Sequence, residues 1–459
     1  MYICRVSTLD IIKLIIMRKN ILLIFSAICL FSMCTQSPKK ESRIKNDPEM
    51  TTQTKPAINF YIENSVSMDG YLKGATGFRQ DIISYLNNIK LLEVTDSLNF
   101  FYINTADKPN QILHNASLDV ISDFAGKFEL KTFQKEGGSG RGYTDIAAII
   151  KKMLGETMPN TISILVSDFI FSPDATTNPQ EYLFNQQIGI KNTMVTRFEK
   201  VSNPAFVVYQ LQSEFDGPFF YFDKSKGKEV KWTDDKNKDK NKDYKGIRPF
   251  YIWIIGDVKN VSELCQKVPE TKFKGQNEER KVKIFSIMAG NKEVNYAVKP
   301  NSGNFDLSRK STKTDIDNLA KDSRTGKVNF SVNVDFSNLL LDDAYLTNAD
   351  NYELNNSNYR MKVKTCPPNK HGYTHTLNFV ADRIYKGTVT IKLKKEGSLP
   401  QWIKDADASS SKQTHDIDDE YGSQPELGKT YGIEPLIKGV FEGFTLKDKY
   451  YTEIKININ

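Results

Sequence analysis

The chain has 459 residues, of which 39% are hydrophobic and 11% aromatic, a composition that predicts a globular protein of two or three domains and excludes a disordered one. Its formal net charge is +7, and the first 33 residues account for +3 of it. The remaining +4 is too small a charge for a chain of this length to indicate nucleic-acid binding.

The N-terminus has the pattern of a targeting segment. A basic pair, Arg18 and Lys19, follows Met17, and an apolar stretch over residues 21–31 precedes Cys34. A basic region, a short hydrophobic region and a cleavage zone are typical of a secretory signal, so we expect residues 1–33 to be a signal segment. The alternative is an uncleaved signal anchor, although the apolar stretch is short for a membrane span.

The sequence LFSMC, which ends at Cys34, resembles the lipobox of bacterial lipoproteins. The resemblance implies that Cys34 is lipidated and that the protein is anchored to a membrane of the bacterial cell envelope. Residues 34–56 contain hardly any apolar side chain, so we expect them to form a disordered tether. The tether has no acidic block, which favours the periplasmic side over the cell surface.

Strands alternate with helices from residue 57 to about residue 270. Strands are predicted at 57–63, 98–104, 161–169, 205–212 and 249–257, and helices at 77–92, 117–128, 144–154 and 181–201. Near-continuous apolar strands between helices predict a doubly wound, mostly parallel sheet covered on both faces. An insertion over about 215–247 is expected to hold a hairpin and a low-complexity loop.

The pattern changes to period two in the region 278–459. Strands are predicted at 282–290, 326–336, 359–365, 375–381, 386–394 and 450–459, with one short amphipathic helix at 432–444. This predicts a β-sandwich-like region with a small helical element. A disulfide between Cys265 and Cys366 is possible on sequence grounds, but Cys265 lies on an apolar helical face, which favours a buried free thiol.

Oxygen-bearing side chains occur where predicted elements of the α/β domain meet. Glu63, Ser65 and Ser67 follow the first strand, Thr144 lies in a Gly-rich loop just before a helix, and Asp168 ends another strand. In open α/β sheets, ligands gather at the carboxyl ends of the strands. Hydroxyl and carboxylate oxygens suit a hard cation, so the five residues form a candidate Mg²⁺ site.

This order resembles the von Willebrand factor type A domain over residues 57–270. The metal-ion-dependent adhesion site of that family has Asp-x-Ser-x-Ser after the first strand, a Thr in a Gly-rich turn and an Asp after the fourth strand. Glu63 stands at the position of the first Asp, Ser65 and Ser67 at the serines, Thr144 at the threonine and Asp168 at the second Asp. The resemblance implies a non-enzymatic protein whose bound Mg²⁺ accepts an acidic residue of a protein partner.

The chain departs from the family pattern at two positions. Glu63 is one methylene longer than Asp, and Phe169 follows Asp168 where the family commonly has Gly. The second functional hypothesis is a metal-dependent envelope hydrolase that uses Glu63 and Asp168.

Without a metal, the same serines would be turn hydroxyls, and Thr144 would cap the helix that follows it. Arg141, in the Gly-rich segment GGSGRG, is expected to be solvent-exposed.

Overall fold

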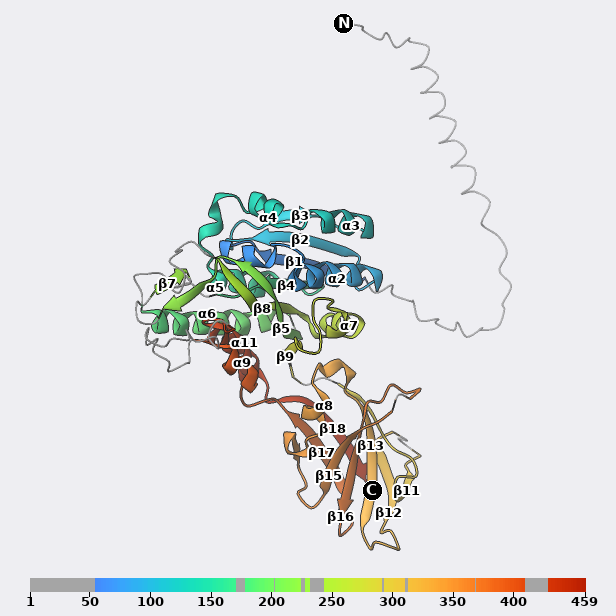
Figure 1. Ribbon diagram of the computed structural model, residues 1–459. Helices are drawn as coiled ribbons and strands as arrows, with labels where there is room; N and C mark the ends of the chain where they lie inside the picture. The colour runs from blue at the N-terminus through green and yellow to red at the C-terminus, as the bar shows by residue number, and fades with distance from the viewer. Residues whose placement is uncertain are drawn as a thin grey trace, which may run out of the picture. The chain divides into compact units, whose positions relative to one another are not determined.

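The computed structural model describes residues 54–170, 178–201, 203–223, 228–231, 243–290, 293–309, 313–367, 369–408 and 428–459. They form a mixed α/β part with a seven-stranded sheet, and a four-stranded and a five-stranded sheet further along the chain (Figure 1). The predicted signal segment, Cys34 and most of the predicted tether lie outside these residues. Within them, no helix is long and apolar enough to cross a membrane.

The seven-stranded sheet has the order β3-β2-β1-β4-β8-β5-β9. Its strands are β1 (Ala57–Glu63), β2 (Ser97–Ile103), β3 (Asn110–Leu113), β4 (Thr161–Ser167), β5 (Pro204–Gly217), β8 (Tyr244–Asp257) and β9 (Lys283–Met288). β1 is parallel to β2 and β4, and every other neighbouring pair is antiparallel. The parallel arrangement predicted from the sequence is therefore found at the centre of a mixed sheet. β5 and β8 pair as arms of a long hairpin, which needs no crossover helix and runs antiparallel.

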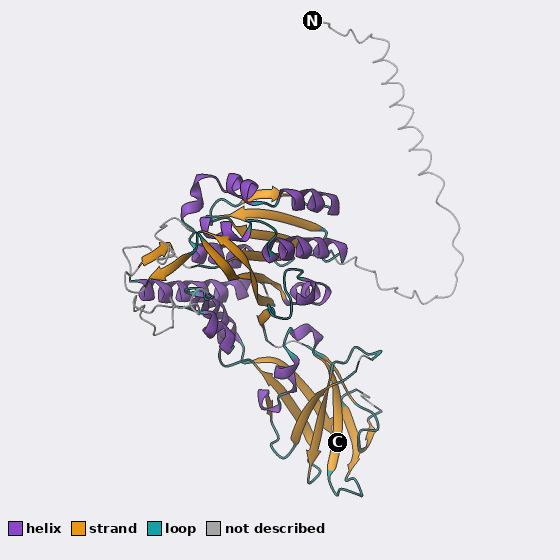
Figure 2. Ribbon diagram, in the orientation of Figure 1, coloured by secondary structure: helices purple, strands orange, loops and turns teal. Residues whose placement is uncertain are grey.

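Helices cover both faces of this sheet, as predicted (Figure 2). They are α2 (Gly77–Leu91), α3 (Leu118–Lys127) and α7 (Val258–Lys267) on one face and α5 (Ile146–Glu156) and α6 (Pro179–Lys200) on the other. Two adjacent residues of β4 show the division, because Ile164 packs in the first core and Leu165 in the second. Burial on both faces explains the continuous apolar runs of the central strands.

A second helical layer lies over α6. It consists of α9 (Gln401–Ala406) and α11 (Ile433–Lys447), and α11 packs along α6. The two helices approach closely at Gly439 and Gly443, where an added Cβ would come within 2.6 Å of the Gln187 carbonyl oxygen and 2.7 Å of Met194 Cβ. The apolar side of α11 thereby completes the core on this face of the sheet.

The predicted division between residues 270 and 278 does not match the way the chain packs. β9, which was assigned to the C-terminal region, pairs with β5 at the edge of the seven-stranded sheet. The helix predicted at 432–444 belongs to the hydrophobic core beneath α5 and α6. The α/β part is therefore assembled from two stretches of sequence with the other sheets between them. Periodicity alone could not show this, because an edge strand and a sandwich strand have the same alternation.

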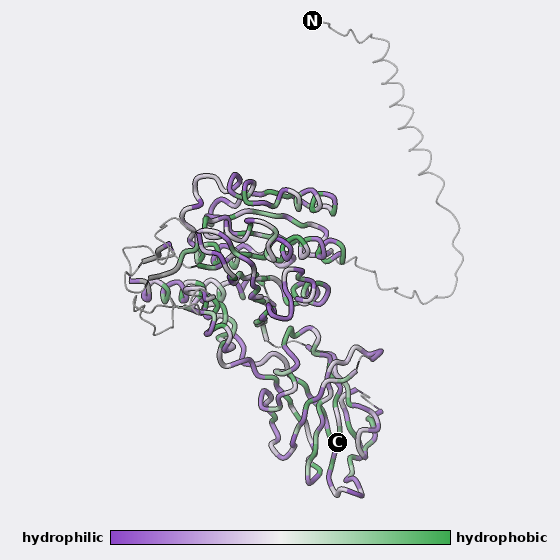
Figure 3. Tube along the Cα trace, viewed as in Figure 1, coloured by the Kyte–Doolittle hydropathy of each residue, from purple (hydrophilic) through white to green (hydrophobic). Residues whose placement is uncertain are grey.

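The C-terminal region contains a four-stranded sheet of order β10-β13-β16-β15 and a five-stranded sheet of order β11-β12-β18-β17-β14. The strands are β10 (Asn295–Val298), β11 (Asn304–Leu307), β12 (Asp315–Ala320), β13 (Val328–Asp335), β14 (Tyr352–Leu354), β15 (Arg360–Thr365), β16 (His375–Ala381), β17 (Gly387–Lys394) and β18 (Tyr450–Ile458). All neighbouring pairs are antiparallel except β12 and β18. Buried and partly buried residues alternate along β16 and along β17 from Val389 onward, and Figure 3 shows hydrophobic and hydrophilic residues interspersed in this region. The period-two prediction is confirmed for these strands.

Two smaller predictions can also be compared with the structure. The insertion over 215–247 contains a hairpin, β6 (Phe220–Asp223) with β7 (Lys228–Lys231), and most of its low-complexity stretch lies outside the described residues.

Cys265 and Cys366 are free thiols, so they form no disulfide. Burial raises the pKa of Cys265 to about 11, which makes this thiol a weak nucleophile at neutral pH.

Candidate functional site

The five candidate ligands come together at the carboxyl ends of β1 and β4. These strands are parallel neighbours, with Ile62 opposite Val166, so Glu63 and Asp168 reach the same edge of the sheet. Parallel pairing therefore brings together two acids that are more than a hundred residues apart in sequence.

The serines lie in the turn that follows β1. Ser65 precedes a short 3₁₀ helix, η1 (Val66–Tyr71), and its hydroxyl lies 2.8 Å from that of Ser67. Ser65 makes no capping hydrogen bond to this helix. Its oxygen is directed to Glu63 and that of Ser67 to Asp168. The two serines therefore belong to the acidic site and are not simple helix caps.

Thr144 comes from a separate segment, the turn before α5. Asp145 is the residue that caps α5, because its side chain accepts a hydrogen bond of 2.9 Å from the backbone N–H of Ala148. The Thr144 hydroxyl lies close to the Glu63 carboxylate but has no hydrogen-bond partner of normal geometry among the described residues. A buried polar oxygen without a regular partner is rare in proteins and marks a position where a ligand can bind.

The two acids are buried and influence each other. Glu63 is 3% exposed and Asp168 is 1% exposed. Burial, followed by repulsion from Asp168, raises the pKa of Glu63 to about 8, although hydrogen bonds, the first from Ser167, act in the opposite direction. Burial also raises the pKa of Asp168. The pair therefore holds a proton at neutral pH, which a cation could displace.

Phe169 forms the wall next to Asp168. Its φ of 53° is in the left-handed region, which Gly adopts most easily, and its backbone N–H donates to the Ser167 hydroxyl at 2.6 Å. The ring is fully buried and stacks on Trp253. On the other side, the Thr430 hydroxyl donates to the backbone carbonyl of Asp168 at 3.4 Å. The C-terminal segment therefore helps to enclose the site.

Arg248 of β8 brings a positive charge to the pair. Its side chain is 1% exposed, and its Nη1 donates to the carbonyl of Lys429 at 3.2 Å. Its guanidinium carbon lies 3.9 Å from the centre of the Phe219 ring. The charge of Arg248 lowers the pKa of Asp168, against the larger effect of burial. No motif in the sequence indicated this residue.

The expectation that Arg141 is exposed is wrong. The Gly-rich segment folds as a 3₁₀ helix, η2 (Gly138–Gly142), and Arg141 forms a buried ion pair with Asp69 of η1. Its Nε also donates to Asn64 Oδ1 at 2.7 Å, and its Nη2 to the carbonyl of Ser65 at 2.9 Å. These contacts tie the turn that carries Thr144 to the turn that carries the serines.

The donor set fits a hard cation in chemical type. It offers two carboxylates and three hydroxyls from three separate segments, and these are the oxygen ligands that Mg²⁺ prefers. Within the part of the chain that the structure describes, no three His, Cys, Asp or Glu residues group as metal ligands. Cation binding here would therefore depend on the hydroxyls as well as on Glu63 and Asp168.

Comparisons with protein-family models, with curated proteins and with solved structures gave no match to this chain. By its own fold and site, the chain is a mixed α/β protein with further, mainly antiparallel sheets and with a buried site of carboxylate and hydroxyl groups at the sheet edge.

Proposed function

We propose that this chain is a non-enzymatic binding protein of the bacterial envelope, anchored by lipidated Cys34, that docks a protein partner through a divalent cation. The α/β part would be a type A-like domain and the two C-terminal sheets a sandwich-like spacer. The main support is the convergence of the candidate ligands from three separate segments at one edge of the sheet.

Each of the five side chains has a role in this proposal. Glu63 and Asp168 would neutralise the cation, and Ser65, Ser67 and Thr144 would complete its oxygen shell without adding charge. When bound, the cation would supply a coordination position for a carboxylate oxygen of the partner.

Arg248 supports an acidic partner, because its charge offsets part of the negative charge of the two carboxylates. A site that is less negative repels an incoming carboxylate less. Ser67 is half-buried, whereas the other four candidate ligands are buried, so it marks the side from which a partner could approach.

The turn after Asp168 gives independent support. In the type A family this position commonly holds Gly, and here Phe169 adopts the left-handed backbone that Gly favours. The backbone conformation therefore agrees with the Gly-type turn that the resemblance implies, although the side chain differs.

A thermal melt with and without millimolar Mg²⁺ tests the proposal. A ligand that binds only the folded state stabilises it by RT ln(1 + [L]/Kd), about 2.7 kcal/mol at 100 times Kd. Asp168→Asn and the double change Ser65→Ala with Ser67→Ala should abolish the increase in Tm. Glu63→Asp should increase it if the longer acid loosens the site.

The control is Asp81→Asn, which alters another buried acid. Asp81 lies on α2, and none of the five candidate ligands belongs to that helix. Its carboxylate accepts hydrogen bonds from the backbone N–H of Gly275 and from the side chain of Gln276. This variant should melt at a lower temperature but keep the Mg²⁺ increment. If neither Mg²⁺ nor Mn²⁺ changes the Tm of the wild type or of Glu63→Asp, the cation site is refuted.

A further inference from the structure

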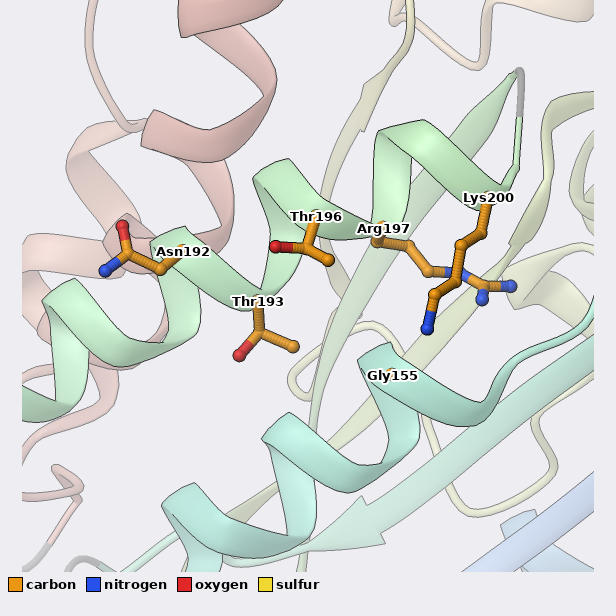
Figure 4. Close-up of a pocket in the computed structure, with 6 residues that line it drawn as sticks. All are labelled: Gly155, Asn192, Thr193, Thr196, Arg197 and Lys200. Atoms are coloured by element: carbon orange, nitrogen blue, oxygen red, sulfur yellow. The ribbon is translucent and has the colours of Figure 1, made fainter.

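A second candidate site lies between α5 and α6, near their C-terminal ends. It is a cavity of about 290 Å³ lined by Gly155, Asn192, Thr193, Thr196, Arg197 and Lys200 (Figure 4). α5 begins next to Thr144, at the edge that carries the acidic site, and Gly155 lies in its last turn. The cavity is therefore separated from Glu63 and Asp168 by the length of that helix.

Arg197 is the unusual residue of this cavity. Its side chain is 2% exposed, yet neither terminal nitrogen of its guanidinium has a hydrogen-bond partner among the described residues. Burial lowers the pKa of Arg197, and no acid acts against this effect. A buried charge without a partner destabilises a protein, so such a group points to a ligand that compensates it.

Lys200 adds a second positive charge one turn further along α6. In the view of Figure 4, the Lys200 amine extends from the last turn of α6 toward Gly155, and the Arg197 guanidinium extends past the Lys200 side chain. In the regions that the structure covers, no carboxylate forms an ion pair with Lys200, whereas Lys191 on the same helix pairs with Glu442 at 3.3 Å. Two adjacent cations without acids form a site that favours an anion.

The helix dipoles do not account for this arrangement. Cations are favoured at helix C-termini, and the cavity lies near the ends of α5 and α6. Each helix end carries roughly half a negative charge, and two ends together balance about one of the two cations. About one positive charge therefore remains in the cavity, and the dipoles supply no hydrogen-bond acceptor to the Arg197 nitrogens.

We propose that this cavity binds the phosphate group of a small phosphomonoester. A phosphate carries a charge of about −1.5 to −2, which matches two cations better than the single charge of a carboxylate. The guanidinium fork of Arg197 suits two phosphate oxygens, and Lys200 would act as a point charge.

The space available also fits an ester. The cavity volume of about 290 Å³ is roughly ten times the ~30 Å³ that one molecule occupies in liquid water. The cavity therefore has room for more than the phosphate group itself. Apart from its chain neighbours and the backbone of its own helix, no atom lies within 4 Å of the position where a Cβ of Gly155 would be. Along α6, Thr196 and Asn192 offer polar groups to the rest of the molecule, whereas the Thr193 hydroxyl already donates to the carbonyl of Gly189 at 2.9 Å.

The experiment measures binding of inorganic phosphate and of glycerol 3-phosphate to the purified protein by calorimetry, with chloride and acetate at the same ionic strength. Both phosphates should bind saturably, and glycerol 3-phosphate should bind more tightly. Arg197→Met should weaken binding by about tenfold or more, because it removes charge-assisted hydrogen bonds. It should also raise the Tm measured without phosphate, since it removes an uncompensated buried charge.

Matched variants separate charge from general effects on folding. Gly155→Asp places a carboxylate in the cavity and should abolish phosphate binding, whereas Gly155→Asn, of nearly the same size, should retain more of it. Lys200→Gln should weaken binding, and Lys127→Gln, at an exposed lysine in the last turn of α3, should not. Equal binding by wild type and Arg197→Met, or an equal response to acetate, would overturn the proposal.

Discussion

The rings of Phe169 and Trp253 stack with their centroids 4.5 Å apart and their planes 19° from parallel. The same Phe169 has a φ of 53°, which is unfavourable for a residue with a Cβ. The turn beside Asp168 thus combines an unfavourable backbone conformation with a favourable side-chain contact.

Phe169→Gly should reveal which effect is larger. The substitution relieves about 1–3 kcal/mol of backbone strain but removes a buried ring worth about 3–5 kcal/mol. We expect a net loss of roughly 2 kcal/mol in the free energy of unfolding, measured by urea denaturation. Asn301→Gly is the control, because Asn301 has a φ of 58° but an exposed side chain, and it should not destabilise the protein. A Phe169→Gly variant more stable than the wild type would contradict the expectation.

The raised pKa of Glu63 predicts a pH dependence of stability. The native pKa is about 8 and the reference value is 4.5, so between these pH values the native state keeps a proton that the unfolded state releases. The free energy of unfolding should therefore fall as pH rises through this range, by up to about 1.4 kcal/mol per unit, and level off above about pH 8. Glu63→Gln should remove this part of the slope, whereas Glu156→Gln, at an exposed acid, should keep it. Identical slopes in the wild type and Glu63→Gln would refute the prediction.

Arg248→Met should remove the positive charge that lowers the pKa of Asp168. A buried carboxylate left without a compensating charge costs about 3–5 kcal/mol, and the loss should be greater at pH 8 than at pH 5, because Glu63, with a pKa of about 8, is protonated at pH 5. Millimolar Mg²⁺ should restore more stability to this variant than to the wild type, in chemical denaturation at both pH values. Arg280→Met breaks the more exposed pair with Glu214 and should cost under about 1 kcal/mol. Equal losses for the two arginines would argue against a role for Arg248 at the acidic site.

Truncation after residue 275 should prevent folding of the α/β part. It removes β9 from the edge of the sheet and uncovers Ile190 and Met194, which α11 covers. We expect the fragment to be insoluble or to lack a cooperative thermal transition in circular dichroism. Gly443→Leu in the full chain tests the same contact, because its side chain would collide with Met194. A fragment that melts cooperatively would show that the two stretches fold independently.

Cys34→Ala should abolish incorporation of a fatty-acid analogue into the membrane fraction. Cys34 is the residue that the lipobox-like sequence places at the modified position. Cys29→Ala, within the preceding apolar stretch, is the control and should leave labelling intact. Labelling that persists without Cys34 would refute the lipid anchor.

Local patterns predicted that Glu63 and Asp168 lie at one edge of the sheet, but they did not predict which residues surround these acids. Glu63 and Asp168 could be placed because both end apolar strands, and parallel strands end at one edge of a sheet. Arg141 and Arg248 could not, because their burial depends on distant partners, Asp69 and Lys429, that no spacing in the sequence relates to them. Sequence reasoning identified the side chains that follow from secondary structure and missed those that follow from tertiary packing.

The return of the chain to the α/β part has a consequence for the order in which the protein can fold during synthesis. α11 covers α6, and β18, which follows it directly, lies between β12 and β17 of the five-stranded sheet. Residues 433–458 thus complete both parts, and neither can finish folding while the ribosome is still making earlier segments. The hydrophobic side of α6 emerges long before its cover, so the nascent chain stays incompletely folded until residues 433–458 have been made. If residues 1–33 act as the predicted signal segment, this delay would keep the preceding residues in a state that can still be exported unfolded.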